Sequence, residues 1–320
     1  MTSSTSQPTV IFLWMVPRTQ STVLAKCMTF VDDTEVWLEP YLSCDFNDTL
    51  YDPNWKKGDP LAERMREAER KNEATEVMKS ARKKLAEEES DFPNLIPQKD
   101  ISYPWVQKQL EKATPDKKFI FVKDESHVIM DHLEYLPNVP TRHTFIIRHP
   151  REIYPSWKDM SMRRWDIAGT KSWEEWHVAD DTPTFPVKDF FQIHHRLWKH
   201  FQINADFDPI IIDGHDLTSK PEVILPKYFK KIGIPYKESY LEWKEGNDIL
   251  EKKWRGSADF VLLAPKVAVY TQAANSCKFL PPKFPRGTPS NPGWNITPDL
   301  KEVIEGALPY YNEMYENRLQ

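Results

Sequence analysis

The chain of 320 residues is long enough to bury one large core, and its contents of 40% hydrophobic and 28% charged residues are ordinary for globular proteins, which excludes a disordered or fibrous chain. Its formal net charge of −5 gives no overall basic field for a phosphate backbone, so we expect no nucleic-acid partner. Cys27, Cys44 and Cys277 are the only cysteines and form no Cys-x-x-Cys pair, which favours a reducing compartment over a disulfide framework or a zinc knuckle.

Four short apolar runs are rich in β-forming residues. They cover 9–16, 118–123, 143–148 and 209–213. Continuous runs of this kind are typical of strands that are buried on both faces of a parallel sheet. The first run is cut by Pro17 and is too short for a secretion signal or a membrane span. We therefore expect a cytoplasmic protein without membrane contact, and one further strand that ends at Glu39.

Segments with a helical spacing of apolar residues lie between these runs. They are 21–31, 61–89, 127–136, 150–164, 186–204, 220–232 and 298–318. The alternation predicts one α/β domain over 1–320, with helices on both faces of a central parallel sheet and ligands at the carboxyl ends of its strands. The stretch 61–89 is dense in Glu, Lys and Arg, which predicts a charged helical insertion, either a solvated surface helix or a lid. The Pro-rich segment 281–292 predicts an ordered loop or a short extended connector.

The loop after the first strand has the composition of an anion site. It joins a buried strand to the start of a helix, where free backbone N–H groups and the helix dipole attract negative charge. Arg18 adds a planar cation, and Thr19, Ser21 and Thr22 add hydroxyl donors. The alternative is that Ser21 or Thr22 only caps the helix.

A second cationic motif follows the third run. Arg148 stands at the strand end, and Ser156 follows eight residues later, about two turns into the next predicted helix. Both side chains are therefore expected to reach one phosphate group.

Together the two motifs resemble the sulfotransferase family that uses 3′-phosphoadenosine-5′-phosphosulfate (PAPS). That family has Pro-Arg/Lys-Ser/Thr-x-Ser/Thr-Thr after an N-terminal strand and Arg-x7-Ser after a later one. The resemblance implies a P-loop NTPase-like three-layer sandwich with a central parallel sheet. It assigns 18–22 (Arg18, Thr19, Gln20, Ser21 and Thr22) to the 5′-phosphosulfate, and Arg148 and Ser156 to the 3′-phosphate. The implied product is 3′-phosphoadenosine 5′-phosphate, and no metal is expected because arginines and the helix dipole supply positive charge.

Two later segments extend the resemblance. The segment 211–217 and the following 228–235 are similar to the family's strand ending in an acidic-Leu pair and to its "Phe-Leu-Gly-Ile". Arg286, in an Arg-Gly pair that precedes Gly-Trp at 293–294, resembles the family segment that closes over the 3′-phosphate. Arg255, also followed by Gly, is the competing candidate for that role.

Two positions depart from the family pattern. The family commonly has Gly where this chain has Gln20, and its cytosolic small-molecule branch has Trp where this chain has Val23. Arg18, in place of the Lys of that branch, is similar to the tyrosylprotein and carbohydrate branches, and also to a group of soluble bacterial and plant-like members with Leu-Trp-x-Val-Pro-Arg. We expect a small-molecule acceptor with a hydroxyl or an amine; neither the acceptor nor the oligomeric state follows from the sequence.

Sulfuryl transfer by in-line displacement needs a base for the acceptor proton and cations for the developing charge. Glu39 resembles the catalytic Glu of the tyrosylprotein branch, His127 lies near the His of the cytosolic branch, and Glu125 is the third candidate base. Lys123 is expected to neutralise the transferring group, and Arg18 to stabilise the leaving phosphate.

Other motifs are set aside or left open. His194, His195 and His200 lack an acidic or Cys partner at ligand spacing, so we predict packing on a helix and no metal site. Trp157, Trp165, Trp173 and Trp176 fit an acceptor-pocket wall or the core equally well. The chain has no Walker loop, dinucleotide turn or nucleophile elbow. The alternatives to a sulfotransferase are a nucleotide-dependent kinase of related fold and a non-catalytic adaptor that binds a bisphosphate.

Overall fold

The structure is a computed structural model, and it describes residues 7–73, 94–96, 98–112, 116–164, 171–180, 184–245, 253–263 and 270–320. Seven parallel strands form one sheet in the order β3-β7-β2-β4-β1-β5-β6. The strands are β1 Thr9–Met15, β2 Thr34–Leu38, β3 Leu95–Ile96, β4 Phe119–Glu125, β5 Thr141–Ile147, β6 Ile210–Asp213 and β7 Trp254–Ser257. The predicted central parallel sheet is therefore confirmed.

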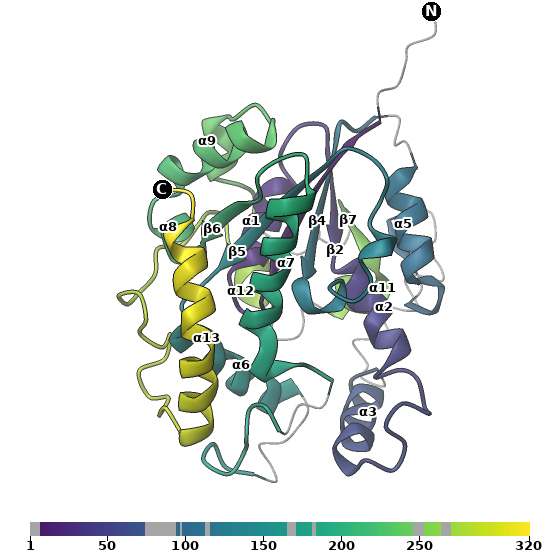
Figure 1. The fold of residues 1–320 in the computed structure, drawn as a ribbon, viewed down its shortest axis with the longest axis vertical. Helices are drawn as coiled ribbons and strands as arrows, with labels where there is room; N and C mark the ends of the chain where they lie inside the picture. The colour runs from purple at the N-terminus through teal and green to yellow at the C-terminus, as the bar shows by residue number, and fades with distance from the viewer. Residues whose placement is uncertain are drawn as a thin grey trace, which may run out of the picture.

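Helices cover both faces of the sheet, which gives the predicted α/β sandwich of three layers. In Figure 1, α7 and α13 pass in front of the strands, and α1 and α12 lie behind them. The α-helices are α1 Ser21–Met28, α2 Pro40–Asp48, α3 Pro60–Glu73, α5 Tyr103–Glu111, α6 Pro150–Arg164, α7 Phe190–Asn204, α8 Gly214–Ser219, α9 Pro221–Ile232, α11 Ala258–Leu263, α12 Thr271–Ala274 and α13 Pro298–Glu316. Short 3-10 helices are η1 Gln98–Asp100, η2 Ser126–Val128, η3 Leu133–Tyr135, η5 Val187–Asp189 and η6 Glu238–Leu241.

The apolar sequences of the strands follow from their burial on both faces of the sheet. β1 lies between β4 and β5, and its residues 10–15 are all buried. A strand that is covered on both faces needs apolar side chains at successive positions rather than at alternate ones. The four apolar runs of the sequence are the strands β1, β4, β5 and β6, and the strand expected before Glu39 is β2.

Most of the predicted helices are confirmed, with shifted ends. α6 has the predicted bounds of 150–164, whereas Pro221 separates α8 from α9 because a proline disfavours helical geometry at the residue before it. Within 61–89, residues 61–73 are helical, and 74–89 lie outside the described residues.

The predicted helix over 127–136 is wrong. The chain there makes the two separate 3-10 turns η2 and η3. The consecutive residues Val128 and Ile129 are both buried, so the segment turns two adjacent side chains inward at the end of β4. Pro137 disfavours helical geometry at Leu136, so η3 cannot continue into a longer helix.

The parallel sheet brings the candidate site residues to one edge. Glu39 follows β2, Lys123 and Glu125 end β4, the loop 16–20 follows β1, and Arg148 follows β5. Because β2, β4, β1 and β5 are consecutive neighbours, their carboxyl ends form one continuous row. The candidate site is built along this row.

Candidate active site

The loop between β1 and α1 has an unusual backbone. Arg18 and Gln20 have φ of 72° and 69°, in the left-handed region that costs a non-glycine residue roughly 1–2 kcal/mol. Thr19 Oγ1 donates to Val16 O at 2.9 Å, and Thr218 Oγ1 donates to Gln20 Oε1 at 3.2 Å. These contacts hold the loop in a fixed shape at the start of α1.

Gly214, the first residue of α8, leaves room for the loop between β1 and α1. A Cβ at Gly214 would lie 2.6 Å from the carbonyl oxygen of Thr19 and 3.3 Å from Gln20 Oε1. The backbone of α8 can therefore approach the loop this closely only without a side chain at 214. Nothing local in the sequence marks this contact.

A cavity of about 540 Å³ opens along the carboxyl edge of the sheet. The loop contributes Arg18, Gln20, Ser21 and Thr22 to its wall. Within the described residues, the cavity wall does not include Thr19. Its hydroxyl is fully buried and turns back to the loop backbone. Ser21 lies at the N-terminus of α1 and donates to Met15 Sδ.

The two cationic motifs meet in this cavity. Arg18 Nε donates to Ser156 Oγ at 3.0 Å, and Arg148 Nη1 donates to the carbonyl oxygen of Arg18 at 3.0 Å. Burial, together with the charge of Arg148, lowers the pKa of Arg18 to about 10. Both arginines are partly buried; the charge of Arg148 disfavours the charged form of Arg18, and an anion in the cavity would relieve that cost.

Glu152 links Arg148 to the segment 281–292. Arg148 Nε donates to Glu152 Oε2 at 2.8 Å, and the backbone N–H of Gly287 donates to Glu152 Oε1 at 2.8 Å. Glu152 is buried, and it lies one turn after Arg148 in the chain. As predicted, the segment contains no helix or strand, and it contributes several residues to the cavity wall.

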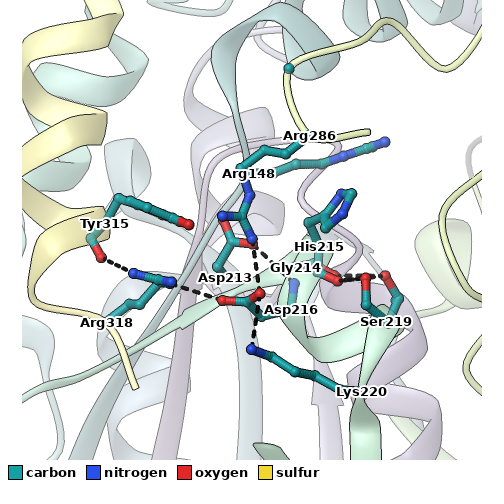
Figure 2. A network of polar contacts seen from close by, with 12 residues as sticks. Arg148, Asp213, Gly214, His215, Asp216, Ser219, Lys220, Arg286, Tyr315 and Arg318 are labelled. Carbon is teal, nitrogen blue, oxygen red and sulfur yellow. Dashed lines mark hydrogen bonds and ion pairs between the residues drawn. The ribbon is translucent and has the colours of Figure 1, made fainter. Parts of the chain in front are cut away.

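Arg286 belongs to a polar network behind the cavity wall rather than to the wall itself. Its Nη2 donates to Asp213 Oδ1 at 2.8 Å and to Asp216 Oδ1 at 2.9 Å. Arg318, close to the end of the chain, donates from Nε to Asp216 Oδ2 at 2.8 Å. Figure 2 shows this network with Arg148 beside Arg286. Arg286 thus lies next to the second motif, but it is held by carboxylates.

Arg255, the competing candidate, lies elsewhere. It is on β7, which three strands separate from β5. Its guanidinium group stacks 4.7 Å from the ring centroid of Trp37, and Nη2 donates to Gln109. The structure therefore brings Arg286, and not Arg255, close to Arg148.

Glu39 and Lys123 form an ion pair in the floor of the cavity. Lys123 Nζ donates to Glu39 Oε1, and the Tyr270 hydroxyl donates to Glu39 Oε2 at 2.6 Å. All three side chains line the cavity, and Glu39 is only 1% exposed. The backbone of Glu39 is left-handed, with φ of 48°. A carboxylate, a cation and a phenol therefore meet at one point of the wall.

The other two candidate bases lie side by side. Glu125 lines the cavity, and burial raises the pKa of its carboxyl group. His127 is not among the described residues of the wall; its Nδ1 lies 3.2 Å from Glu125 Oε2, and its ring packs near Phe185 and Phe190. His127 is thus placed behind Glu125 as seen from the cavity.

The remaining wall is mainly apolar. It includes Leu42, Phe46, Trp157, Met160, Phe185 and Phe260. Of the four tryptophans in question, Trp157 lines the cavity, Trp176 is in the core, Trp173 stacks on Trp294 at the cavity edge, and Trp165 lies outside the described residues. One of the four thus faces the cavity from within the hydrophobic core.

The three histidines set aside in the sequence have different partners. His194 pairs with Ser126, His195 with Glu313 and His200 with Asn204. Within the described residues, no group of three or more His, Cys, Asp or Glu side chains is arranged to hold a metal ion. Among the helices that the structure describes, none has both the length and the apolar character needed to cross a membrane.

Sequence reasoning assigned no role to three residues of the site, Tyr270, Gly214 and Glu152. Tyr270 pairs with Glu39 across 231 positions, and Gly214 is recognised only by its distance to the loop. Glu152 was visible as an acidic residue one turn after Arg148, and its spacing was the available signal. For Tyr270 no local pattern existed.

No protein-family model and no curated protein matches the chain. Among solved structures it is similar to a sulfotransferase domain from the curacin biosynthetic pathway, with 14% identity and a TM-score of 0.45, over 94% of this chain and 97% of that one. It is also similar to a sulfotransferase domain from the Synechococcus PCC 7002 olefin synthase, with 14% identity and a TM-score of 0.43, over 95% and 96%. At this level of similarity, only the chain's own residues can identify a function.

Proposed function

We propose that the chain is a PAPS-dependent sulfotransferase, which transfers a sulfuryl group to a hydroxyl or an amine of a small-molecule acceptor in the cytoplasm. The observation that carries the proposal is the contact between the two motifs: Arg18 to Ser156, and Arg148 to the backbone of Arg18. They are 138 and 130 positions apart in the chain. A ligand with two separate phosphate groups explains why two anion motifs share one cavity.

The donor site would use both motifs. The N-terminus of α1, with Arg18, Gln20, Ser21 and Thr22, suits the 5′-phosphosulfate because its N–H groups and dipole favour negative charge. Arg148 and Ser156 suit the 3′-phosphate, with Arg286 close behind. Thr19 would contribute its backbone N–H rather than its hydroxyl. No metal is invoked, since the arginines and the helix end carry the positive charge.

The reaction would proceed by in-line displacement at sulfur. The acceptor oxygen or nitrogen bonds to sulfur, the bond from sulfur to the 5′-phosphate oxygen breaks, and the acceptor proton passes to a base. Glu39 is the base we favour over His127, because Glu39 lines the cavity beside Lys123. Lys123 would stabilise the charge on the transferring group, and Arg18 the charge on the leaving phosphate.

The experiment that tests the proposal measures the melting temperature with 3′-phosphoadenosine 5′-phosphate, and with AMP and ATP as controls. A ligand at one hundred times its Kd stabilises the native state by about 2.7 kcal/mol. We expect a shift that requires the 3′-phosphate and that Arg148→Ala abolishes. Arg151→Ala, which changes an exposed arginine in the first turn of α6, three residues after Arg148, should keep the shift.

Other outcomes would favour the alternatives. An equal shift with ATP, or none with the bisphosphate, would reject the sulfotransferase and favour a kinase of related fold. A specific shift without product from any acceptor would indicate a non-catalytic adaptor.

A further inference from the structure

The Tyr270 hydroxyl occupies a special position in the cavity. It donates to Glu39 Oε2 at 2.6 Å, and the Tyr270 ring centroid lies 5.3 Å from Lys123 Nζ. A base must lie about 2.6–3.2 Å from the atom whose proton it abstracts. The Tyr270 hydroxyl therefore has the relation to Glu39 that the acceptor hydroxyl of a transfer reaction requires.

Tyr270 is also close to the loop that suits the phosphosulfate. It lines the same cavity wall as Arg18, Ser21 and Thr22. Its phenol raises the pKa of Arg18, against the larger opposing effects of burial and of Arg148. It immediately precedes α12, which packs against α1. The Tyr270 side chain thus faces the same cavity as the candidate base and the N-terminal end of α1.

The chemistry of a phenol suits this position. Its ordinary pKa of about 10 is far below that of an aliphatic alcohol, so its oxygen becomes nucleophilic more readily once a base takes the proton. Lys123 lies close enough to stabilise the charge that develops, and Arg18 lines the same cavity. A tyrosine that only oriented Glu39 would need the hydrogen bond, but it would not need to face the donor cavity.

We propose that Tyr270 is an internal acceptor, and that the chain transfers one sulfuryl group from PAPS to its own Tyr270; this inference rests on the proposed function. In the step, the bond between Tyr270 Oη and sulfur forms, and the bond between sulfur and the 5′-phosphate oxygen breaks. The phenolic proton passes to Glu39 Oε2. The products are a tyrosine O-sulfate and 3′-phosphoadenosine 5′-phosphate.

Intact-mass measurement before and after incubation with PAPS tests the step without any knowledge of the external acceptor. We expect each chain to gain the mass of one SO3 group, and peptide mapping to locate it at Tyr270. Tyr270→Phe should gain none, whereas Tyr310→Phe, which changes a half-buried tyrosine on α13, should gain one. Glu39→Gln should slow the gain by roughly 10²-fold to 10⁴-fold, the usual contribution of a general base.

The reaction should occur within one chain. Its rate constant should not change with protein concentration, and wild-type protein should not label a mass-tagged Glu39→Gln chain mixed with it. Binding of the bisphosphate is measured on each variant by thermal shift, which reports folding and the donor site separately.

Three results would overturn the inference. They are no gain of SO3 while the bisphosphate still binds, a gain at a residue other than Tyr270, and labelling of one chain by another. In each of them the donor site stands. A wild-type chain that does not bind the bisphosphate overturns the inference together with the proposed function.

Discussion

Replacing Gly214 by alanine should displace the first loop without touching any charged group. The new Cβ would meet the Thr19 carbonyl oxygen at 2.6 Å, whereas ordinary contact begins at 3.4 Å. Since the near atom is backbone, the loop or α8 must move by about 0.8 Å. A misplacement of about 1 Å at a reacting centre can reduce the rate by about 10²-fold. We expect Gly214→Ala to fold, but to bind 3′-phosphoadenosine 5′-phosphate much more weakly.

Titration calorimetry with the bisphosphate is the direct assay, with Gly306→Ala as the matched control. A Cβ at Gly306, in the middle of α13, meets nothing within 4 Å, so alanine there should stabilise the helix by up to about 1 kcal/mol. Its affinity for the bisphosphate should equal that of the wild type. If Gly214→Ala bound as tightly as the wild type, the loop geometry would not determine the donor site, and the reasoning would be refuted.

Three further predictions address the base, the buried acid and a buried histidine. Glu39→Gln should lower transfer to an identified acceptor by roughly 10²-fold to 10⁴-fold, while His127→Ala keeps most of it; the reverse pattern in steady-state rates would make His127 the base. Glu152→Gln should lower the melting temperature of the free protein, because it weakens a charged hydrogen bond to Arg148 worth about 1.5–3 kcal/mol, and thermal unfolding that matches the wild type would contradict this. Burial lowers the pKa of His143 from 6.5 to about 3, so the folded protein keeps this ring neutral. The unfolded chain binds a proton at His143 below pH 6.5. The free energy of unfolding therefore falls by about 1.4 kcal/mol per pH unit as the pH falls from 6.5 towards 3. Denaturant unfolding of the wild type and of His143→Gln over that range should show this difference, and parallel pH profiles would exclude it.

The fold was predictable because its strongest signals are local. β1, β4, β5 and β6 each contain a run of consecutive apolar residues, so the two-sided burial of a parallel strand is visible in the sequence. β7 could not be found in this way. It is four residues long and contains Arg255 and Gly256, and its place in the sheet comes from pairing with β2, far away in the chain.

The residues of the candidate site could also be predicted in part, but the contacts between them could not. Arg18 and Arg148 could be chosen because each follows a visible strand, and parallel strands bring their carboxyl ends to one edge. Their mutual contact through the backbone of Arg18 could not be derived. It depends on a left-handed residue where the sequence has no glycine to indicate one. The usual rule that positive φ requires glycine therefore fails at the residue most directly involved in the proposed function.

This failure has a physical cause. A left-handed non-glycine residue persists only when its surroundings hold it there, and such residues are concentrated at functional sites. Here Arg18, Gln20 and Glu39 all have positive φ, and all three line the cavity. Their side chains are held by Ser156, Thr218 and Lys123, which come from three other segments of the fold. The strain is thus offset by contacts distant in sequence, which is why local patterns located the site but could not describe its shape.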